Sequence, residues 1–391
     1  MRPRLFNRRA FLQCSVVLAA GAPVALRLSR LELLAAGALP GPGRSDSKVA
    51  IVSCRSYGPE VREALAKSFD LLGGIEPLVK NKTVTVKLNL TGTNFAPFLG
   101  RPVGETYMTH ETTALALGSL LFVAGARRVR FVESTQSKAE LAATLALAGW
   151  DLKRFDALGK VEFENTRNLG TAKSYSHLRV PSGGYMFSAF DFNHCYMETD
   201  VMVSLAKLKN HLTAGVTLSL KNLFGITPNS LYGNEAGSED ATEGRLVLHD
   251  PSSAQKLKLP GLKDGITSAD PTWRVPRITA DVCSARPIHL AIIDGITSMS
   301  GGEGPWCGGA GPLKVTTPGL LIAGLNPVST DAVGTGIMGY ADPRVARGTK
   351  PFHFCDNHLL LAEQAGLGTA DLGQIDVRGL TLEKARYPYE G

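Results

Sequence analysis

The chain has 391 residues, of which 44% are hydrophobic, so it can form a substantial core and is not a disordered or fibrous protein. Most of its formal net charge of +7 comes from one end. Residues 1–45 hold seven of the 42 basic residues and one of the 35 acidic residues, which leaves 35 and 34 for the remainder. A body so close to neutral has no overall attraction to nucleic acid or to anionic lipid.

Residues 1–38 have the features of a signal peptide. Arg8 and Arg9 stand before Ala-Phe-Leu, and an apolar run follows at residues 14–26. A basic start followed by an apolar run is the order of a secretory signal, and the arginine pair resembles the twin-arginine export signal. The sequence therefore predicts a periplasmic or otherwise exported protein that the twin-arginine export machinery carries. An amphipathic N-terminal helix is the alternative, because charged residues follow the apolar run closely.

Residues 39–47 are rich in Pro, Gly and Ser, which is typical of a flexible junction. Beyond it we expect one large α/β domain over residues 48–391, with two lobes, 48–155 and 156–391, as the alternative. Short β-branched runs alternate with helical patterns, which predicts βαβ units and a mostly parallel sheet with flanking helices. The predicted strands are 49–53, 83–88, 128–132, 201–205, 290–293 and 320–323, and the predicted helices are 60–72, 112–124 and 139–147.

The second half also contains a long insertion at residues 229–276, which is rich in Gly, Ser, Asp and Pro. A structureless loop of this length is uncommon in a compact domain, so we expect a lid or a functional insertion with some helix of its own. No later segment has about 18 uninterrupted apolar residues, so we expect no membrane span after the signal is removed.

Polar side chains follow several of the predicted strands. Ligands of open parallel sheets gather at the carboxyl ends of the strands, so these side chains are candidates for one site. They are Lys87 and Asn89, then Lys207, Lys209 and His211, then Asp294, and finally Asp331. Taken singly each position is ordinary, because a chain often leaves its core through a polar residue and Asp331 would suit the cap of a following helix.

The lysines are less ordinary, because a lysine at a buried rim is seldom left without a partner. That partner is either one of the carboxylates or an anionic ligand. If it is a small anionic ligand, the substrate-binding residues are Lys87, Asn89, Lys207, Lys209, Lys221 and Asn222. Asp294, Glu303 and Asp331 would then bind a divalent metal or serve in acid–base chemistry, with His211 and Glu303 as the candidate catalytic residues.

Several motifs of known chemistry are absent from the sequence. The glycine-rich segment 301–311 lacks the phosphate-loop pattern, and no Gly-x-Gly-x-x-Gly opens a helix after the first strand, so nucleotide binding is not supported. There is no Gly-x-Ser-x-Gly elbow and no His-Glu-x-x-His zinc helix. Five cysteines follow the leader without ferredoxin-like spacing, which disfavours an iron–sulfur cluster and favours buried thiols with at most one disulfide.

Four motifs occur in order along the chain: Lys87-Leu88-Asn89, residues 205–211 with 221–225, residues 294–305, and residues 326–332. Together they resemble the family catalogued as domain of unknown function 362. The resemblance implies that the four motifs belong to one site, and it names no reaction. Some members of the family are iron–sulfur proteins with a ferredoxin-type module, whose cysteines this chain lacks. Asn210 stands where many relatives have Thr before the histidine.

The leading hypothesis is therefore an exported enzyme that acts on a small anionic substrate with a divalent metal. The alternative is a periplasmic accessory protein that binds an anion or a metal without turnover. An iron–sulfur redox protein is a second alternative.

Replacement of both Arg8 and Arg9 by Lys should strand the precursor in the cytoplasm, because the export receptor recognises the guanidinium pair and not charge alone. Fractionation of cells that express either form checks this prediction. Unchanged accumulation of the Lys-Lys form in the periplasm would remove the twin-arginine assignment.

Overall fold

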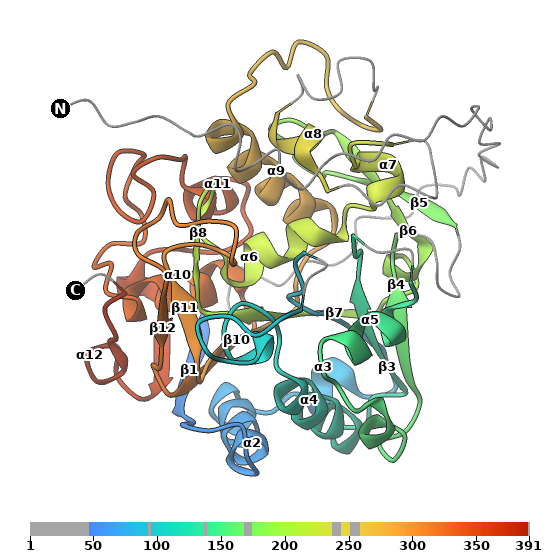
Figure 1. The fold of residues 1–391 in the computed structure, drawn as a ribbon, viewed down its shortest axis with the longest axis vertical. Helices are drawn as coiled ribbons and strands as arrows, with labels where there is room; N and C mark the ends of the chain where they lie inside the picture. Colours follow the sequence, from blue (N-terminus) through green and yellow to red (C-terminus); the bar gives the residue numbers. More distant parts are fainter. Residues whose placement is uncertain are drawn as a thin grey trace.

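One eight-stranded sheet contains strands from both halves of the chain (Figure 1). The computed structural model describes residues 47–389 apart from 93–94, 137–138, 168–173, 237–243 and 251–258, so the predicted signal peptide lies outside the described residues. In sheet order the strands are β14 (Asp376–Gly379), β1 (Lys48–Ser53), β13 (Leu320–Gly324), β10 (Leu290–Gly295), β7 (Val201–Lys207), β2 (Thr83–Lys87), β3 (Arg128–Glu133) and β4 (Val161–Asn165). Strand β13 is antiparallel to both of its neighbours, and the other neighbouring strands are parallel.

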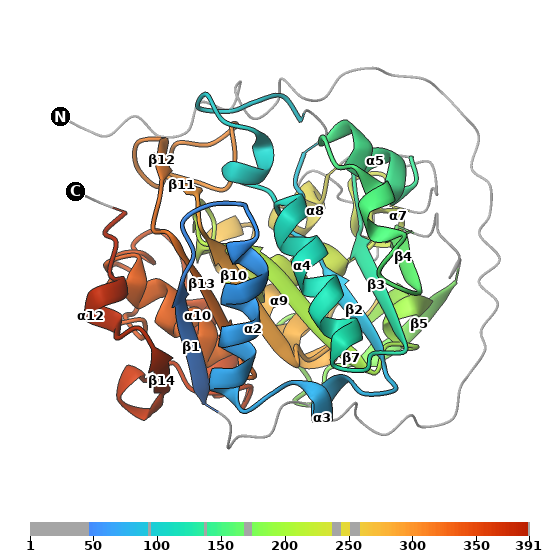
Figure 2. The same cartoon turned by 90° about the horizontal axis from the view of Figure 1, so that it is seen from below.

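Helices cover both faces of this sheet (Figure 2). On one face lie α2 (Glu60–Leu72) and α4 (Glu111–Val123), and on the other lie α6 (Leu218–Leu223), α9 (Pro271–Ala285) and α10 (Pro327–Ile337). Strand β10 shows why both faces must be covered. Leu290 and Ile292 belong to one apolar core, whereas Ala291 and Ile293 belong to the other. A strand buried on both faces appears in the sequence as an uninterrupted apolar run, which explains the short runs on which the α/β prediction rested.

Shorter elements surround the two cores. The helices are α3 (Glu76–Val79), α5 (Leu141–Leu147), α7 (Asn229–Tyr232), α8 (Leu246–His249), α11 (His358–Gln364) and α12 (Leu382–Ala385). The two-stranded pairs are β5 (Tyr175–Arg179) with β6 (Ala189–Asn193), β8 (Asn210–His211) with β9 (Gly215–Val216), and β11 (Ser298–Ser300) with β12 (Lys314–Thr316).

The structure confirms the predicted α/β class with a mostly parallel sheet and flanking helices. The insertion at residues 229–276 contains α7, α8 and the beginning of α9, so its described part includes helix. The sequence did not indicate the edge strands β4 and β14 or the reversed direction of β13. Among the residues that the structure describes, no helix combines the length and the apolar character needed to span a bilayer.

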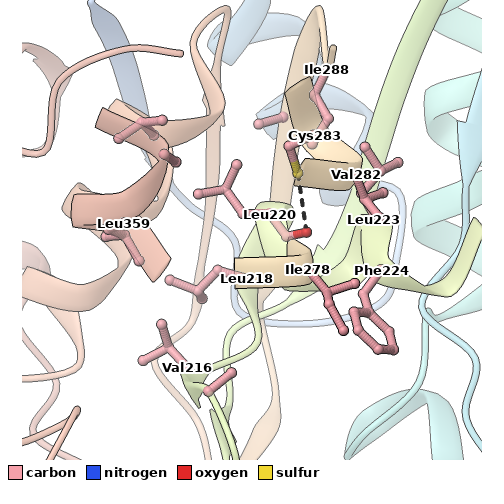
Figure 3. Packing of buried hydrophobic residues seen from close by; sticks show 14 of the residues in the cluster. Val216, Leu218, Leu220, Leu223, Phe224, Ile278, Val282, Cys283, Ile288 and Leu359 are labelled. Atoms are coloured by element: carbon pink, nitrogen blue, oxygen red, sulfur yellow. Dashed lines mark hydrogen bonds between the residues drawn. The ribbon is translucent and has the colours of Figure 1, made fainter. Parts of the chain in front are cut away.

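Helix α6 lies at the centre of the molecule, and all six of its residues are buried. Figure 3 shows its leucines packed against Ile278 and Val282 of α9, with the thiol of Cys283 donating a hydrogen bond to the carbonyl oxygen of Leu220 at 3.5 Å. Cys283 is one of five described cysteines, all of which are buried and free of disulfides. Thiols in such packing behave as small apolar side chains.

Asp331 of α10 fixes the beginning of α6. Its two carboxylate oxygens accept hydrogen bonds from the backbone N–H groups of Ser219 and Leu220, each at 2.8 Å. Burial raises the pKa of Asp331 to about 7, and the two N–H groups oppose that shift. The adjacent Leu218 has a φ of 42°, a conformation that an L-residue keeps only when its surroundings enforce it. Asp331 is thus a helix cap, although for α6 and not for its own helix.

Candidate functional site

Two ion pairs occupy the carboxyl ends of four neighbouring strands, β10, β7, β2 and β3. Lys207 Nζ lies 3.4 Å from Asp294 Oδ2, and Lys87 Nζ lies 2.7 Å from Glu133 Oε1. The four side chains are at most 3% exposed. Parallel strands place their carboxyl ends at one edge of a sheet, which is why residues so distant in sequence meet here.

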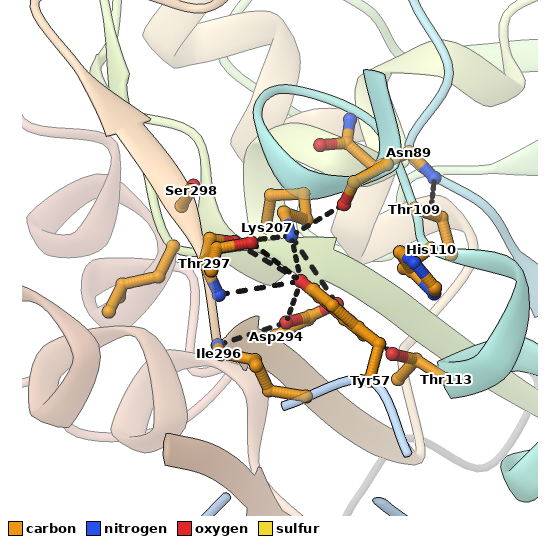
Figure 4. A network of polar contacts seen from close by, with 12 residues as sticks. Tyr57, Asn89, Thr109, His110, Thr113, Lys207, Asp294, Ile296, Thr297 and Ser298 are labelled. Carbon is orange, nitrogen blue, oxygen red and sulfur yellow. Dashed lines mark hydrogen bonds and ion pairs between the residues drawn. The ribbon is translucent and has the colours of Figure 1, made fainter. Parts of the chain in front are cut away.

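Lys207 is fully committed to protein partners (Figure 4). Its ammonium group donates hydrogen bonds to Tyr57 Oη at 2.8 Å, to the carbonyl oxygen of Gly104 at 3.1 Å and to that of Thr297 at 2.6 Å. The hydroxyl group of Tyr57 donates in turn to Asp294 at 3.0 Å. An ammonium group has three N–H donors, so none remains for an external anion. The predicted anion-binding role of Lys207 is therefore replaced by a structural one.

Lys87 is enclosed in the same way. Besides its ion pair with Glu133, it donates to the carbonyl oxygen of Leu88 at 2.7 Å. A Cβ atom added to Gly225 would lie 2.8 Å from Lys87 Nζ, so only glycine allows the chain to pass this close. Asn222 of α6 donates a hydrogen bond to the carbonyl oxygen of Lys87 at 3.3 Å and so connects the helix to β2. Two protein acceptors thus hold Lys87, and its role in binding a small anion stays a prediction.

Lys209 has hydrogen bonds but no carboxylate partner among the described residues. Its Nζ atom donates to the carbonyl oxygens of Tyr107 at 2.6 Å and of Glu303 at 2.9 Å. Burial lowers the pKa of Lys209 to about 7, and the neighbouring Lys221 lowers it further, whereas the Glu303 carboxylate opposes the shift.

Lys221 differs from the other three lysines. It is 9% exposed, its Nζ atom lies 4.1 Å from the centre of the Phe224 ring, and it forms no hydrogen bond or ion pair with any residue that the structure describes. Burial lowers its pKa to about 7, and the charge of Arg245 contributes to this, whereas Glu303 opposes it. No acceptor among the described residues therefore holds this amine in place.

Two histidines lie within electrostatic range of Lys221. His211 Nδ1 accepts a hydrogen bond from the backbone N–H of Thr213 at 3.2 Å, which assigns the proton of the neutral ring to Nε2. His249 Nδ1 lies 2.8 Å from the carbonyl oxygen of Arg245, which assigns the proton to Nδ1 and leaves Nε2 as an acceptor. Burial lowers the pKa of His249 to about 4 and that of His211 well below its usual value, and Lys221 adds to both shifts. Both rings are therefore neutral at pH 7.

Glu303 connects the glycine-rich loop to these groups. One of its carboxylate oxygens accepts from the backbone N–H of Leu212 at 2.9 Å and lies 3.9 Å from His211 Nδ1. Its side chain is 18% exposed. We call Lys209, His211, Lys221, His249 and Glu303 the Lys221 cluster. Glu303 and His249 are its partly exposed members, so solvent reaches the cluster past these two.

The three carboxylates predicted to bind a divalent metal do not come together as ligands. Asp294 is paired with Lys207, Asp331 caps α6, and Glu303 accepts from Leu212. In the described part of the chain, no group of three or more His, Cys, Asp or Glu side chains is arranged to hold a metal ion. The oxygens of Asp294 and Asp331 already accept N–H and O–H donors, which is the physical reason for the difference.

Two amide oxygens at the site are buried without a hydrogen bond, Asn89 Oδ1 and Asn222 Oδ1. Such acceptors call for a donor, as a ligand hydroxyl or a water molecule provides. Two surface hollows lie away from the cluster, one of about 410 Å³ beside Ser53 and Lys67 and one of about 340 Å³ beside Arg344.

The four sequence motifs therefore contact one another in space. Asn222 contacts Lys87, Lys207 pairs with Asp294, Gly301 donates its backbone N–H to Asn210 Oδ1 at 3.2 Å, and Asp331 caps α6. The family model described as "Domain of unknown function (DUF362)" matches residues 84–336, which include all four motifs. The chain belongs to this family.

Two further similarities are more limited. The chain is 30% identical over 91 residues to the thylakoid-associated protein sll1697 of Synechocystis sp. (strain ATCC 27184 / PCC 6803 / Kazusa). That match covers 22% of this chain and 25% of the relative, so the chain spans only about a quarter of its length. A solved structure of a Thermotoga maritima protein is similar over 68% of this chain and 55% of its own, with 14% identity and a TM-score of 0.30.

Sequence reasoning missed several residues of the site. Glu133 is the last residue of β3 and obeys the same strand-end rule as Lys87, but the predicted strand stopped at residue 132. Tyr57 lies just beyond β1, where the same rule applies. His249 lies within the predicted functional insertion, which was the one signal for it. The contact of Phe224 with Lys221 follows from helical spacing, because residues three apart are neighbours on a helix.

Replacement of Lys207 by Met should lower the free energy of unfolding by about 3–5 kcal/mol, because it leaves the buried Asp294 carboxylate without its cation. Urea unfolding at pH 7 measures the change, with Lys153→Met on an exposed surface as the control. A loss below about 1 kcal/mol would show that Asp294 and Lys207 are not a buried pair.

Proposed function

We propose that the Lys221 cluster binds a small anionic ligand and that the protein is an exported enzyme that acts on it. The observation that carries this proposal is that two largely buried lysines lack partners among the described residues: Lys221 has no hydrogen-bond acceptor there, and Lys209 has no carboxylate partner. The predicted anion site thus shifts from Lys87 and Lys207, which have carboxylates, to the two lysines that do not.

Electrostatics supports this assignment. Two protonated amines in a poorly solvated site repel each other, and the charge of Lys221 lowers the pKa of Lys209. An anion between them would supply acceptors to both, raise both pKa values and draw protons from solvent. The lowered pKa values of the two lysines support this assignment, because burial and neighbouring positive charge are the conditions that a bound anion would relieve.

The remaining members of the cluster suit proton transfer. His211 and His249 are neutral at pH 7 and each keeps one ring nitrogen for donation or acceptance. Glu303 is a partly exposed carboxylate that can exchange protons with solvent. We assign anion binding to Lys209 and Lys221 and proton transfer to His211 and Glu303. Asn222 and Asp331 position α6 and take no part in the chemistry.

A binding protein that captures the anion without turnover is the second candidate. The observation in its favour is the enclosure of the cluster, because Lys209 is 1% exposed and Lys221 is 9% exposed. Steady-state turnover of a bound anion distinguishes the two functions. The proposal that the protein is exported rests on Arg8 and Arg9 of the sequence.

Sulfate, phosphate or acetate should stabilise the wild-type protein at constant ionic strength, by about 1–3 kcal/mol at 10–100 times the Kd. Replacement of Lys221 by Met should raise the stability without ligand, because a buried amine is lost, and should abolish the response to anions. Lys153→Met should keep the response. Thermal melts with chloride as the balancing salt make the comparison. An equal response of the Lys221→Met protein would place the anion elsewhere.

A further inference from the structure

We propose that Lys221 is a nucleophile that forms an imine with the carbonyl carbon of a small oxo acid. This inference rests on the proposed anion site and names its substrate class. The carboxylate of the oxo acid would occupy the anion site at Lys209, and its carbonyl carbon would face Lys221 Nζ.

The first argument is the freedom of the Lys221 amine. An attacking amine needs a lone pair that no hydrogen bond or ion pair holds in place. Lys87 and Lys207 are held by carboxylates, and Lys209 is held by two carbonyl oxygens. Lys221 alone among these four buried lysines has no such contact with the described residues.

The second argument is the environment of this amine. The Phe224 ring forms an apolar wall 4.1 Å from Nζ, and an apolar, buried site favours the neutral amine over the ammonium ion. A pKa of about 7 leaves a large fraction of the amine unprotonated at neutral pH.

The third argument is the rigidity of the element that carries the amine. Asp331 holds the first turn of α6, and every residue of the helix is buried. The neighbouring Asn222 donates to Ser204 Oγ at 3.0 Å and so ties the helix to β7. A nucleophile on a fixed helix meets its target in one orientation, which lowers the entropic part of the barrier.

The chemistry balances without an oxidant or a reductant. The nitrogen lone pair of Lys221 attacks the carbonyl carbon, the π electrons of the C=O bond move to oxygen, and one nitrogen proton passes by way of Glu303 to that oxygen, which gives the neutral carbinolamine. A proton that Glu303 takes from solvent then allows the hydroxyl group to leave as water while the nitrogen lone pair forms the C=N bond. The protonated imine returns its N–H proton to Glu303, and Glu303 returns it to solvent. The net change is amine plus oxo acid to imine plus water.

Reductive trapping tests the inference on the whole protein. Pyruvate or glyoxylate is added with sodium borohydride, which converts an imine to a stable secondary amine, and peptide mass analysis locates the adduct. We expect at least a tenfold excess of adduct on Lys221 over any other lysine in the wild type. Lys153→Met should retain this adduct, and Lys221→Met should lose it while its melting curve shows that it is folded.

The outcomes separate this inference from the proposed function. If pyruvate and sulfate both stabilise the protein but no adduct forms on Lys221, the imine is wrong and the anion site stands. If neither anion stabilises the protein and no adduct forms, the anion site and the imine are both wrong. An adduct that persists at other lysines to the same extent in Lys221→Met also overturns the inference.

Discussion

The burial of four amines at one end of a parallel sheet is the constraint on which the rest of this structure depends. Each buried ammonium group needs acceptors or must lose its proton. Lys207 forms an ion pair with Asp294, and Lys87 forms one with Glu133 at the end of β3. Lys209 and Lys221 have no carboxylate partner in the described chain. Lys207 and Lys87 thus belong to the structural framework, whereas Lys209 and Lys221 are the candidates for binding a ligand.

The surrounding structure holds Lys209 and Lys221 close to side chains that can transfer protons. Asp331 fixes α6, α6 carries Lys221, and the glycine-rich loop brings Glu303 over the segment that contains Lys209 and His211. Tyr389, near the C-terminus, adds a further contact by donating a hydrogen bond to the carbonyl oxygen of Leu208. The same contacts that join the four family motifs therefore define the site.

The sequence was sufficient for the parts of this arrangement that follow from local patterns. Apolar runs indicated β7 and β10, and the strand-end rule identified Lys207 and Asp294 as neighbours in one site. The sequence alone could not show which side chains pair with each other, because the ion pair between Lys207 and Asp294 depends on which strands lie side by side. Asp331 illustrates the same limit, since it caps a helix more than a hundred residues away in the chain. His249 was beyond reach because nothing local distinguishes it from any other polar residue of the insertion.

The central claim is that the largely buried amine of Lys221 has no partner among the residues that the structure describes, and the pH dependence of stability tests it most directly. Its pKa is about 7 in the folded protein and near 10.5 in the unfolded chain, so between these values the unfolded chain binds more protons. The free energy of unfolding of the wild type must then rise with pH over that window.

The decisive measurement is the difference in free energy of unfolding between Lys221→Met and the wild type from pH 6 to about pH 10. The account predicts that the variant is more stable at pH 7 and that its advantage shrinks as the pH rises toward 10, where the amine is neutral in the folded protein and increasingly so in the unfolded chain. A wild type that is more stable than the variant at pH 7, with a gap that does not change with pH, would contradict it.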